Sequence, residues 1–286
     1  MAIGIKSTAS FLKTLFLFGK SDIPAAALPT IAVALVLTGL PGIPAFATGI
    51  LWLEIHLLAF QIKNQIDGID EDRVAKPYRP LPAGRLSLQT AKQLYYTFFV
   101  LMLLIGALTK TLTCTLTYTA MILAYNEGRL AEFPLSKNIL AAGGLICYCW
   151  GVTVIFDQGL PLHGYKLLAV TLLGAIFATT GHASDFRDRT ADALMGRKTI
   201  PLLLPPRLAR WSLAVLIALW TAGLMCLWQP PVLASITFTM LAVWTLVGFV
   251  ASHDEKDDRK SYVLYGFWLL SSNLLPIFAR SRGLLV

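Results

Sequence analysis

The chain has 286 residues, of which 56% are hydrophobic and only 14% are charged, and its mean hydropathy is +0.66. Ordinary soluble domains carry about 25% charged residues, so this composition excludes a soluble protein and indicates an integral, multi-pass membrane protein. The formal net charge of +8 is spread over short segments between apolar stretches, with no separate basic domain, and this excludes nucleic acid as a partner.

Residues 1–22 are predicted to form an amphipathic helix on the bilayer surface. Lys13 and Lys20 interrupt the apolar run FLKTLFLFGKSDI, and no small-residue cleavage site follows it, which argues against a signal peptide. Phe11, Leu15 and Phe18 would lie on one side of this helix.

Residues 23–286 contain about nine apolar stretches that can cross the ~30 Å hydrocarbon core of a bilayer. We therefore predict a single domain over residues 1–286, an all-α membrane protein with about nine transmembrane helices in a bundle. The predicted spans are 23–40, 43–63, 90–109, 111–125, 138–157, 163–184, 203–228, 232–251 and 262–279.

Only the sequence GALTKTLT separates the third and fourth spans, so one long helix is the alternative. With nine spans, twenty Lys and Arg residues lie on one face of the membrane and four on the other. With eight spans the distribution is twelve to eleven, and Lys110 lies inside the membrane. The positive-inside rule favours nine spans and places the acidic loops on the cytoplasmic face.

Two ionisable residues lie within the second predicted span. Glu54 precedes Asn64 by ten residues, about three helical turns, so the two side chains share a helix face. An ionisable residue within a span is by default a candidate functional residue, although pairing with a neighbouring helix is the structural alternative. His56 is predicted to face lipid headgroups or neighbouring backbone.

The first acidic segment, residues 64–85, reads NQIDGIDEDRVAKPYRPLPAGR. It places four carboxylates within six residues, and basic residues follow at once. The acidic residues are Asp67, Asp70, Glu71 and Asp72, and the basic residues include Lys76, Arg79 and Arg85.

The second acidic segment, residues 182–201, reads HASDFRDRTADALMGRKTIP. On a continuous helix the spacing of Asp185, Asp188 and Asp192 puts all three carboxylates on one face. Three like charges on one face repel one another, so the pattern indicates a bound cation. The structural alternative is a set of solvated loop charges.

A third charged segment, residues 253–260, reads HDEKDDRK. Its acidic and basic residues balance, and Asp157 falls on the opposite face in the nine-span topology. Both features are predicted to be solvated charges.

Clustered carboxylates beside clustered cations suit the binding of a diphosphate through Mg²⁺. One or two carboxylates usually hold Mg²⁺ while phosphate oxygens complete its octahedron. Arg and Lys then bind the remaining phosphate charge. If the diphosphate leaves from an allylic carbon, the metal and these cations offset the departing charge, and the hydrophobic chain lies between the membrane helices.

Two motifs carry a resemblance to a known family. The first consists of Asn64, Asp72 and the run PYRPLPAGRLS, and the second of the three aspartates of residues 185–192 followed by GRKTIP. Together they resemble the signatures of the UbiA-type intramembrane prenyltransferase superfamily. Two departures stand out: Gln65 and Gly68 replace carboxylates that are usual in the first motif, and Ala191 replaces a glycine in the second.

The resemblance implies a helical bundle around a central cavity that binds Mg²⁺ and a polyprenyl diphosphate. The residues it marks as catalytic are Asn64, Asp72, Asp185 and Asp188, to which we add Glu54 as a group that hydrogen-bonds an acceptor or assists loss of a proton. The predicted substrate-binding residues are Arg79, Lys137, Lys198, Asp192 and Tyr125. The predicted metal ligands are Asp70, Asp72, Asp185 and Asp188.

The sequences LFGKSDIP and DEDRVAKPYRP resemble the fungal branch of this superfamily, which includes membrane terpene cyclases. The branch includes transferases as well, but the first motif departs from the transferase pattern. We therefore predict a Mg²⁺-dependent cyclase of farnesyl or geranylgeranyl diphosphate, in the endoplasmic reticulum membrane if the source is eukaryotic. A prenyltransferase that uses an aromatic or other acceptor is the alternative, and a non-catalytic transporter is the third hypothesis. Protein partners are not predicted.

Overall fold

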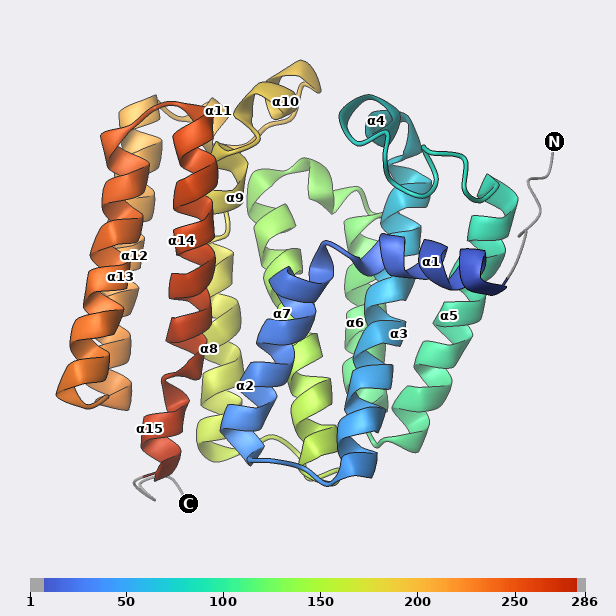
Figure 1. The fold of residues 1–286 in the computed structure, drawn as a ribbon, viewed down its shortest axis with the longest axis horizontal. Helices are drawn as coiled ribbons and strands as arrows, with labels where there is room; N and C mark the ends of the chain where they lie inside the picture. Colours follow the sequence, from blue (N-terminus) through green and yellow to red (C-terminus); the bar gives the residue numbers. More distant parts are fainter. Residues whose placement is uncertain (1–7, 282–286) are drawn as a thin grey trace. The chain divides into compact units, whose positions relative to one another are not determined.

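The structure, a computed structural model, describes residues 8–281, and within them every regular element is a helix (Figure 1). This confirms the all-α fold class. The longer helices are α1 (Thr8–Gly19), α2 (Leu28–Thr38), α3 (Ile43–Asp67), α5 (Leu88–Leu108), α6 (Leu112–Tyr125), α7 (Pro134–Phe156), α8 (Gly164–Thr180), α12 (Pro206–Trp228), α13 (Val232–Ala251) and α14 (Glu255–Leu274). The short helices are η1 (Ile23–Ala27), α4 (Ile69–Ala75), η2 (Leu130–Glu132), α9 (Ala183–Phe186), α10 (Arg189–Leu194), α11 (Ile200–Leu203) and α15 (Pro276–Ser281).

The membrane character is confirmed, because seven helices of the described chain are long and apolar enough to cross a bilayer. An eighth span results if α1 and the η1–α2 segment are taken together, although the chain bends by 53° between them. Each of the nine predicted stretches contains a helix, but α6 has only 14 residues. The number of nine spans therefore stays a prediction.

The third and fourth predicted spans are separate helices, as the charge distribution indicated. α5 ends at Leu108 and α6 begins at Leu112, and Lys110 between them has a left-handed backbone with φ 61°. The Thr111 N–H donates to the Gly106 carbonyl across this turn at 2.9 Å. The chain therefore reverses direction here and does not continue as one helix.

Contacts divide the chain into two compact units. Unit 1 comprises residues up to Arg129 and residues 147–161, and unit 2 comprises residues 130–146 and those from Leu162 onward. α7 contributes its first part to unit 2 and its second part to unit 1. The first acidic segment belongs to unit 1 and the second to unit 2.

In unit 1, α1 runs across α3 (Figure 1). Phe18 is only 1% exposed and packs in a cluster with Ile62, Leu81 and Leu86, whereas Phe16 on another side of the helix is exposed. A helix is thus present in the predicted surface segment from Thr8 onward, residues 1–7 lie outside the described chain, and the place of the segment on the bilayer surface stays a prediction. Its more buried side contacts α3.

His56 is a structural residue of unit 1. Its ring is fully buried, stacks on Trp52 with 3.6 Å between ring centroids, and lies 2.7 Å from the Trp52 carbonyl through Nδ1. Nε2 lies 3.0 Å from Oγ1 of Thr115 on α6. Of the two predicted environments, His56 therefore occupies the one next to neighbouring backbone.

Unit 2 contains a buried ion pair that corrects the prediction of a solvated 253–260 segment. Asp258 is 0% exposed, and Arg210 of α12 donates to both of its oxygens at 2.6 and 2.9 Å. Arg189, at the start of α10, donates to the same carboxylate at 2.9 Å. The hydrogen bond from Arg189 to Asp258 thus holds the short segment α9–α10 against α14.

A labelling experiment tests the nine-span topology. Tyr78→Cys and Leu194→Cys place thiols at exposed positions of the two acidic segments, in a Cys226→Ser background that removes the exposed native thiol. Both are expected to react with a membrane-impermeant maleimide from the same side, because nine spans put both segments on the cytoplasmic face. Reaction from opposite sides would contradict the nine-span topology.

Candidate active site

Asp72 and Arg79 form a buried pair in unit 1. Asp72 lies in α4 and is 3% exposed, and Arg79 Nη1 donates to its two oxygens at 3.0 and 2.8 Å. α4 ends at Ala75, just before Pro77, because a residue that precedes proline is disfavoured in the helical region. The Arg79 N–H then donates to the Lys76 carbonyl, and the resulting turn brings the guanidinium back over α4.

Two other aspartates of the first acidic segment, Asp67 and Asp70, pair with basic residues other than Arg79. Asp70 has an 87% exposed side chain and pairs with Arg73 at 2.6 Å. Asp67 pairs with Lys63 at 2.9 Å. Asp72 is therefore the buried member of these three aspartates, and the role of Asp70 as a metal ligand stays a prediction.

Asp22 is a residue of this region that sequence analysis did not single out. It lies between α1 and η1, and its carboxylate accepts a hydrogen bond from the Gln61 side chain of α3. Burial raises the pKa of Asp22 to about 6, while the charge of Arg79 opposes this rise and that of Glu54 adds to it. A lone Asp before an apolar helix resembles an N-cap, yet its side chain makes no capping hydrogen bond.

Asp22→Asn is expected to raise the melting temperature of the protein at about pH 7.5. The folded-state pKa of Asp22 lies above its ordinary value of 3.8, so the protonated form is favoured by folding and its stabilisation is lost as the pH rises through about 6. Asn is neutral at every pH and removes this loss. Thermal unfolding should show the gain at about pH 7.5 and almost none at about pH 4; an equal gain at both values would contradict this explanation.

In unit 2, two buried carboxylates each have a basic partner. Lys137 of α7 donates to Asp185 Oδ1 at 3.0 Å, and Arg197 donates to Asp192 Oδ1 at 3.1 Å. Both aspartates are 4% exposed. Burial raises the pKa of Asp192, and the nearby Arg197 and Lys137 oppose the rise. These carboxylates and cations therefore form one electrostatic cluster.

Asp188 does not join this cluster, which corrects the prediction that three carboxylates converge on one helix face. The helix breaks after Phe186, and α10 begins only at Arg189. Asp188, with a 51% exposed side chain, pairs with the adjacent Arg187 at 3.2 Å. The i, i+3, i+4 spacing assumed a continuous helix, but the bond from the Thr190 N–H to Glu255 fixes a new helix start.

His182 is a second residue that sequence analysis did not single out. It is 3% exposed, and among the described residues neither ring nitrogen makes a hydrogen bond of good geometry, although the Thr179 backbone lies near the ring. Buried polar groups normally make such hydrogen bonds, so this side chain is unusual. The sequence could have indicated His182 as a candidate site residue, because it lies three residues before Asp185, about one helical turn.

The remaining predicted residues have clear positions but no tested roles. Asn64 and Glu54 are partly exposed on α3, and Tyr125 ends α6 with its ring edge against Phe60 at 5.7 Å between centroids. Lys198 is exposed in the segment between α10 and α11. Their catalytic and substrate-binding roles stay predictions.

The donor chemistry of the buried aspartates suits Mg²⁺. Among residues 8–281, His, Cys, Asp and Glu side chains form no group of three or more arranged to hold a metal ion. However, Mg²⁺ commonly uses only one or two carboxylates and takes its other ligands from phosphates and water. Lys137 binds Asp185 through Oδ1, and Arg197 binds Asp192 through Oδ1. Neither of these two ion pairs uses the Oδ2 atom of the aspartate.

The fold and these side chains define a polytopic helical membrane protein with buried carboxylate–cation pairs in both acidic segments. Residues 26–271 match the model of the UbiA prenyltransferase family, so the chain belongs to this family. It is 57% identical to the fumagillin beta-trans-bergamotene synthase of Aspergillus fumigatus over 278 residues, covering 97% of this chain and 96% of that protein. The predicted superfamily and the prediction of a UbiA-type enzyme are thereby confirmed.

Two further relatives show the range of the family. A diterpene cyclase of Hericium erinaceus is 27% identical over 230 residues, covering 76% of this chain and 70% of that protein. The structure of a UbiA homologue from Archaeoglobus fulgidus bound to GPP and Mg²⁺ aligns with a TM-score of 0.62 at 15% identity, covering 92% of this chain and 99% of that one. This similarity confirms the fold.

Proposed function

We propose that this protein is a membrane terpene cyclase that converts farnesyl diphosphate to a bergamotene-type hydrocarbon. The observation that carries this proposal is the 57% identity to a bergamotene synthase over 97% of the chain. The bergamotene synthase is a fungal and therefore eukaryotic protein. We extend the proposal to a location of this protein in the endoplasmic reticulum membrane.

The buried pairs are suited to hold the diphosphate at the start of the reaction. In the proposed mechanism Arg79 and Lys137 bind phosphate oxygens, with Lys198 as a further cation, since basic side chains form strong charge-assisted hydrogen bonds with phosphate. Asp72 in unit 1 and Asp185 in unit 2, beside the buried Asp192, are the proposed Mg²⁺ ligands, and Asn64 would orient the diphosphate. Asp188 would have to leave its ion pair with Arg187 to act as a further ligand. Bound Mg²⁺ supplies charge neutralisation for the leaving group.

The proposed cyclisation takes place within one substrate molecule and needs no second substrate to accept the prenyl chain. The allylic C–O bond breaks, the diphosphate leaves with the electron pair, and a double bond of the same chain attacks the cation to form a ring. Loss of a proton from the final cation then gives a neutral hydrocarbon. Glu54, a partly exposed carboxylate on α3, is the proposed proton acceptor.

Acceptor-free incubation tests the proposed function. Membranes that contain the protein should convert farnesyl diphosphate with Mg²⁺ to a cyclic hydrocarbon, detected by gas chromatography and mass spectrometry. Geranylgeranyl diphosphate serves as the chain-length comparison. Turnover that requires an added aromatic acceptor would establish the transferase alternative, and protein that binds the diphosphate without consuming it would support the transporter hypothesis.

Replacement of the basic partners distinguishes diphosphate binding from a folding role. Arg79→Ala and Lys137→Ala are each expected to weaken binding of a non-hydrolysable farnesyl diphosphate analogue about tenfold or more, the loss typical of a bond to a charged group. Binding of farnesol, which lacks the charge, should change little. Isothermal titration in detergent measures both ligands, and equal losses for the two would show that these residues serve folding instead.

A further inference from the structure

A cavity that is lined by none of the residues assigned to the diphosphate lies in unit 1, beside α3. Its volume is about 640 Å³, within the range of sites that hold small molecules. The lining residues come from α3, α5, α6 and the residues after α6, and they include neither Asp72 nor Arg79. They are Lys63, Ile66, Asp67, Leu88, Lys92, Tyr95, Tyr96, Phe99, Leu123 and Glu127.

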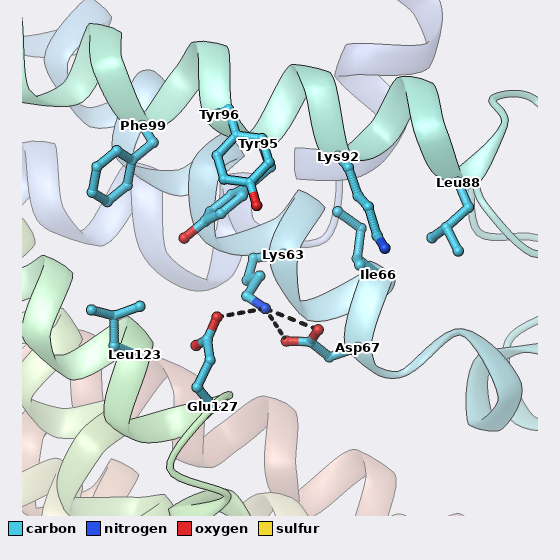
Figure 2. A pocket seen from close by; sticks show the side chains of 10 residues that line it. All are labelled: Lys63, Ile66, Asp67, Leu88, Lys92, Tyr95, Tyr96, Phe99, Leu123 and Glu127. Carbon is cyan, nitrogen blue, oxygen red and sulfur yellow. Dashed lines mark hydrogen bonds and ion pairs between the residues drawn. The ribbon is translucent and has the colours of Figure 1, made fainter.

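The polar lining has two parts of opposite charge. Lys63 pairs with Asp67 at 2.9 Å and with Glu127 at 2.7 Å, so one ammonium serves two carboxylates and this part carries a net negative charge (Figure 2). Lys92 points from α5 toward the cavity in Figure 2, and none of the ion pairs among residues 8–281 involves it. A net negative part and a positive part thus line one cavity.

The cavity lies where the helices reach the membrane surface. α3 ends at Asp67, and α5 begins at Leu88, so Lys63 and Lys92 lie within about one turn of the helix ends. Phe99 and Leu123 line the cavity deeper along α5 and α6. Lys and Tyr residues in this position are typical of the headgroup level of a bilayer.

From these features we infer that the cavity binds the headgroup of a zwitterionic phospholipid. The lipid phosphate pairs with Lys92, and its ammonium group lies near Asp67 and Glu127. The ring of Tyr96, which is 65% exposed, offers an aromatic face to a quaternary ammonium, whereas the ring of Tyr95 already faces the Lys63 ammonium. The apolar residues Phe99 and Leu123 contact the upper part of the acyl chains.

The formal charge of the cavity selects against anionic lipids. Two basic and two acidic residues balance, so a headgroup with a net negative charge leaves the carboxylates without a positive partner from the ligand. A zwitterion satisfies both parts at once. The binding site is independent of the cyclase reaction, because it uses none of the residues assigned to the diphosphate.

Lipid retention tests this inference. The protein is reconstituted in nanodiscs of equal parts dioleoyl phosphatidylcholine, phosphatidylethanolamine and phosphatidylglycerol, and native mass spectrometry identifies the lipids that remain bound. The wild type is expected to retain phosphatidylcholine or phosphatidylethanolamine over phosphatidylglycerol. Lys92→Ala should lower this retention about tenfold, whereas the exposed Lys13→Ala, a charge-matched control outside the cavity, should leave it unchanged.

Two variants sharpen the test. Glu127→Gln leaves Lys63 paired with Asp67 and gives the cavity a net positive charge, so the preference should shift to phosphatidylglycerol. Tyr96→Ala removes an exposed ring without burying a polar group and should reduce retention of phosphatidylcholine more than that of phosphatidylethanolamine. Preference of the wild type for phosphatidylglycerol, or equal behaviour of Lys92→Ala and Lys13→Ala, would overturn the inference.

Discussion

Asp185→Asn and Asp72→Asn are each expected to lower kcat for farnesyl diphosphate by at least ~10², which corresponds to about 2.7 kcal/mol of transition-state stabilisation. Both carboxylates are buried beside a cation, Lys137 and Arg79 respectively. Asn keeps the shape and nearly all the volume of Asp but removes the charge that a hard divalent cation requires. Single-turnover assays with the purified protein measure the effect.

Asp70→Asn is the matched control for these variants. Its carboxylate lies in the same segment as Asp72, yet it is largely exposed and pairs with the nearby Arg73. We expect a clearly smaller loss of kcat for Asp70→Asn than for Asp72→Asn. If Asp185→Asn keeps full activity, or if the wild type turns over in excess chelator, the assignment of these clusters to diphosphate ionisation is wrong.

The positions of the helices could be predicted from the sequence because each depends on local information. Apolar runs of about 17 to 25 residues are long enough to cross a bilayer, and their interruptions are visible as polar or turn residues. Lys110 is an example: its charge made one continuous span unfavourable, and the structure places the turn there. Asp72 and Arg79 could be identified because both belong to one short motif that resembles the family signature; they lie seven residues apart and form a pair.

The features that could not be predicted depend on contacts between distant residues. HDEKDDRK reads as a balanced, solvated segment, because its local pattern is the same whether or not a partner lies elsewhere. Asp258 is nevertheless buried against Arg210, which is 48 residues away in the sequence. The break before α10 has the same origin, since Arg189 and Thr190 bond to residues of the 253–258 segment.

Asp258→Leu is expected to destabilise the protein by about 3–5 kcal/mol, the usual cost of leaving one member of a buried ion pair without its partner. Arg210 is 1% exposed, so its guanidinium cannot reach water when the carboxylate is removed. It would keep only its bond to the Phe249 carbonyl and its position over the Phe186 ring. Thermal unfolding in detergent measures the loss, and Asp257→Leu, at a half-exposed neighbour that pairs with the solvent-exposed Lys260, should cost much less.

The double variant Arg210→Met with Asp258→Leu separates the cost of an unpaired charge from the loss of a specific contact. Apolar side chains of similar volume often replace a buried ion pair without loss of stability, so most of the melting temperature should return. Arg189, which also binds Asp258, is partly exposed and can be solvated. Because Arg189 fastens α10 to α14 through that carboxylate, the double variant should recover stability but not full kcat. Recovery of both would mean that the pair stabilises unit 2 without positioning the second acidic segment.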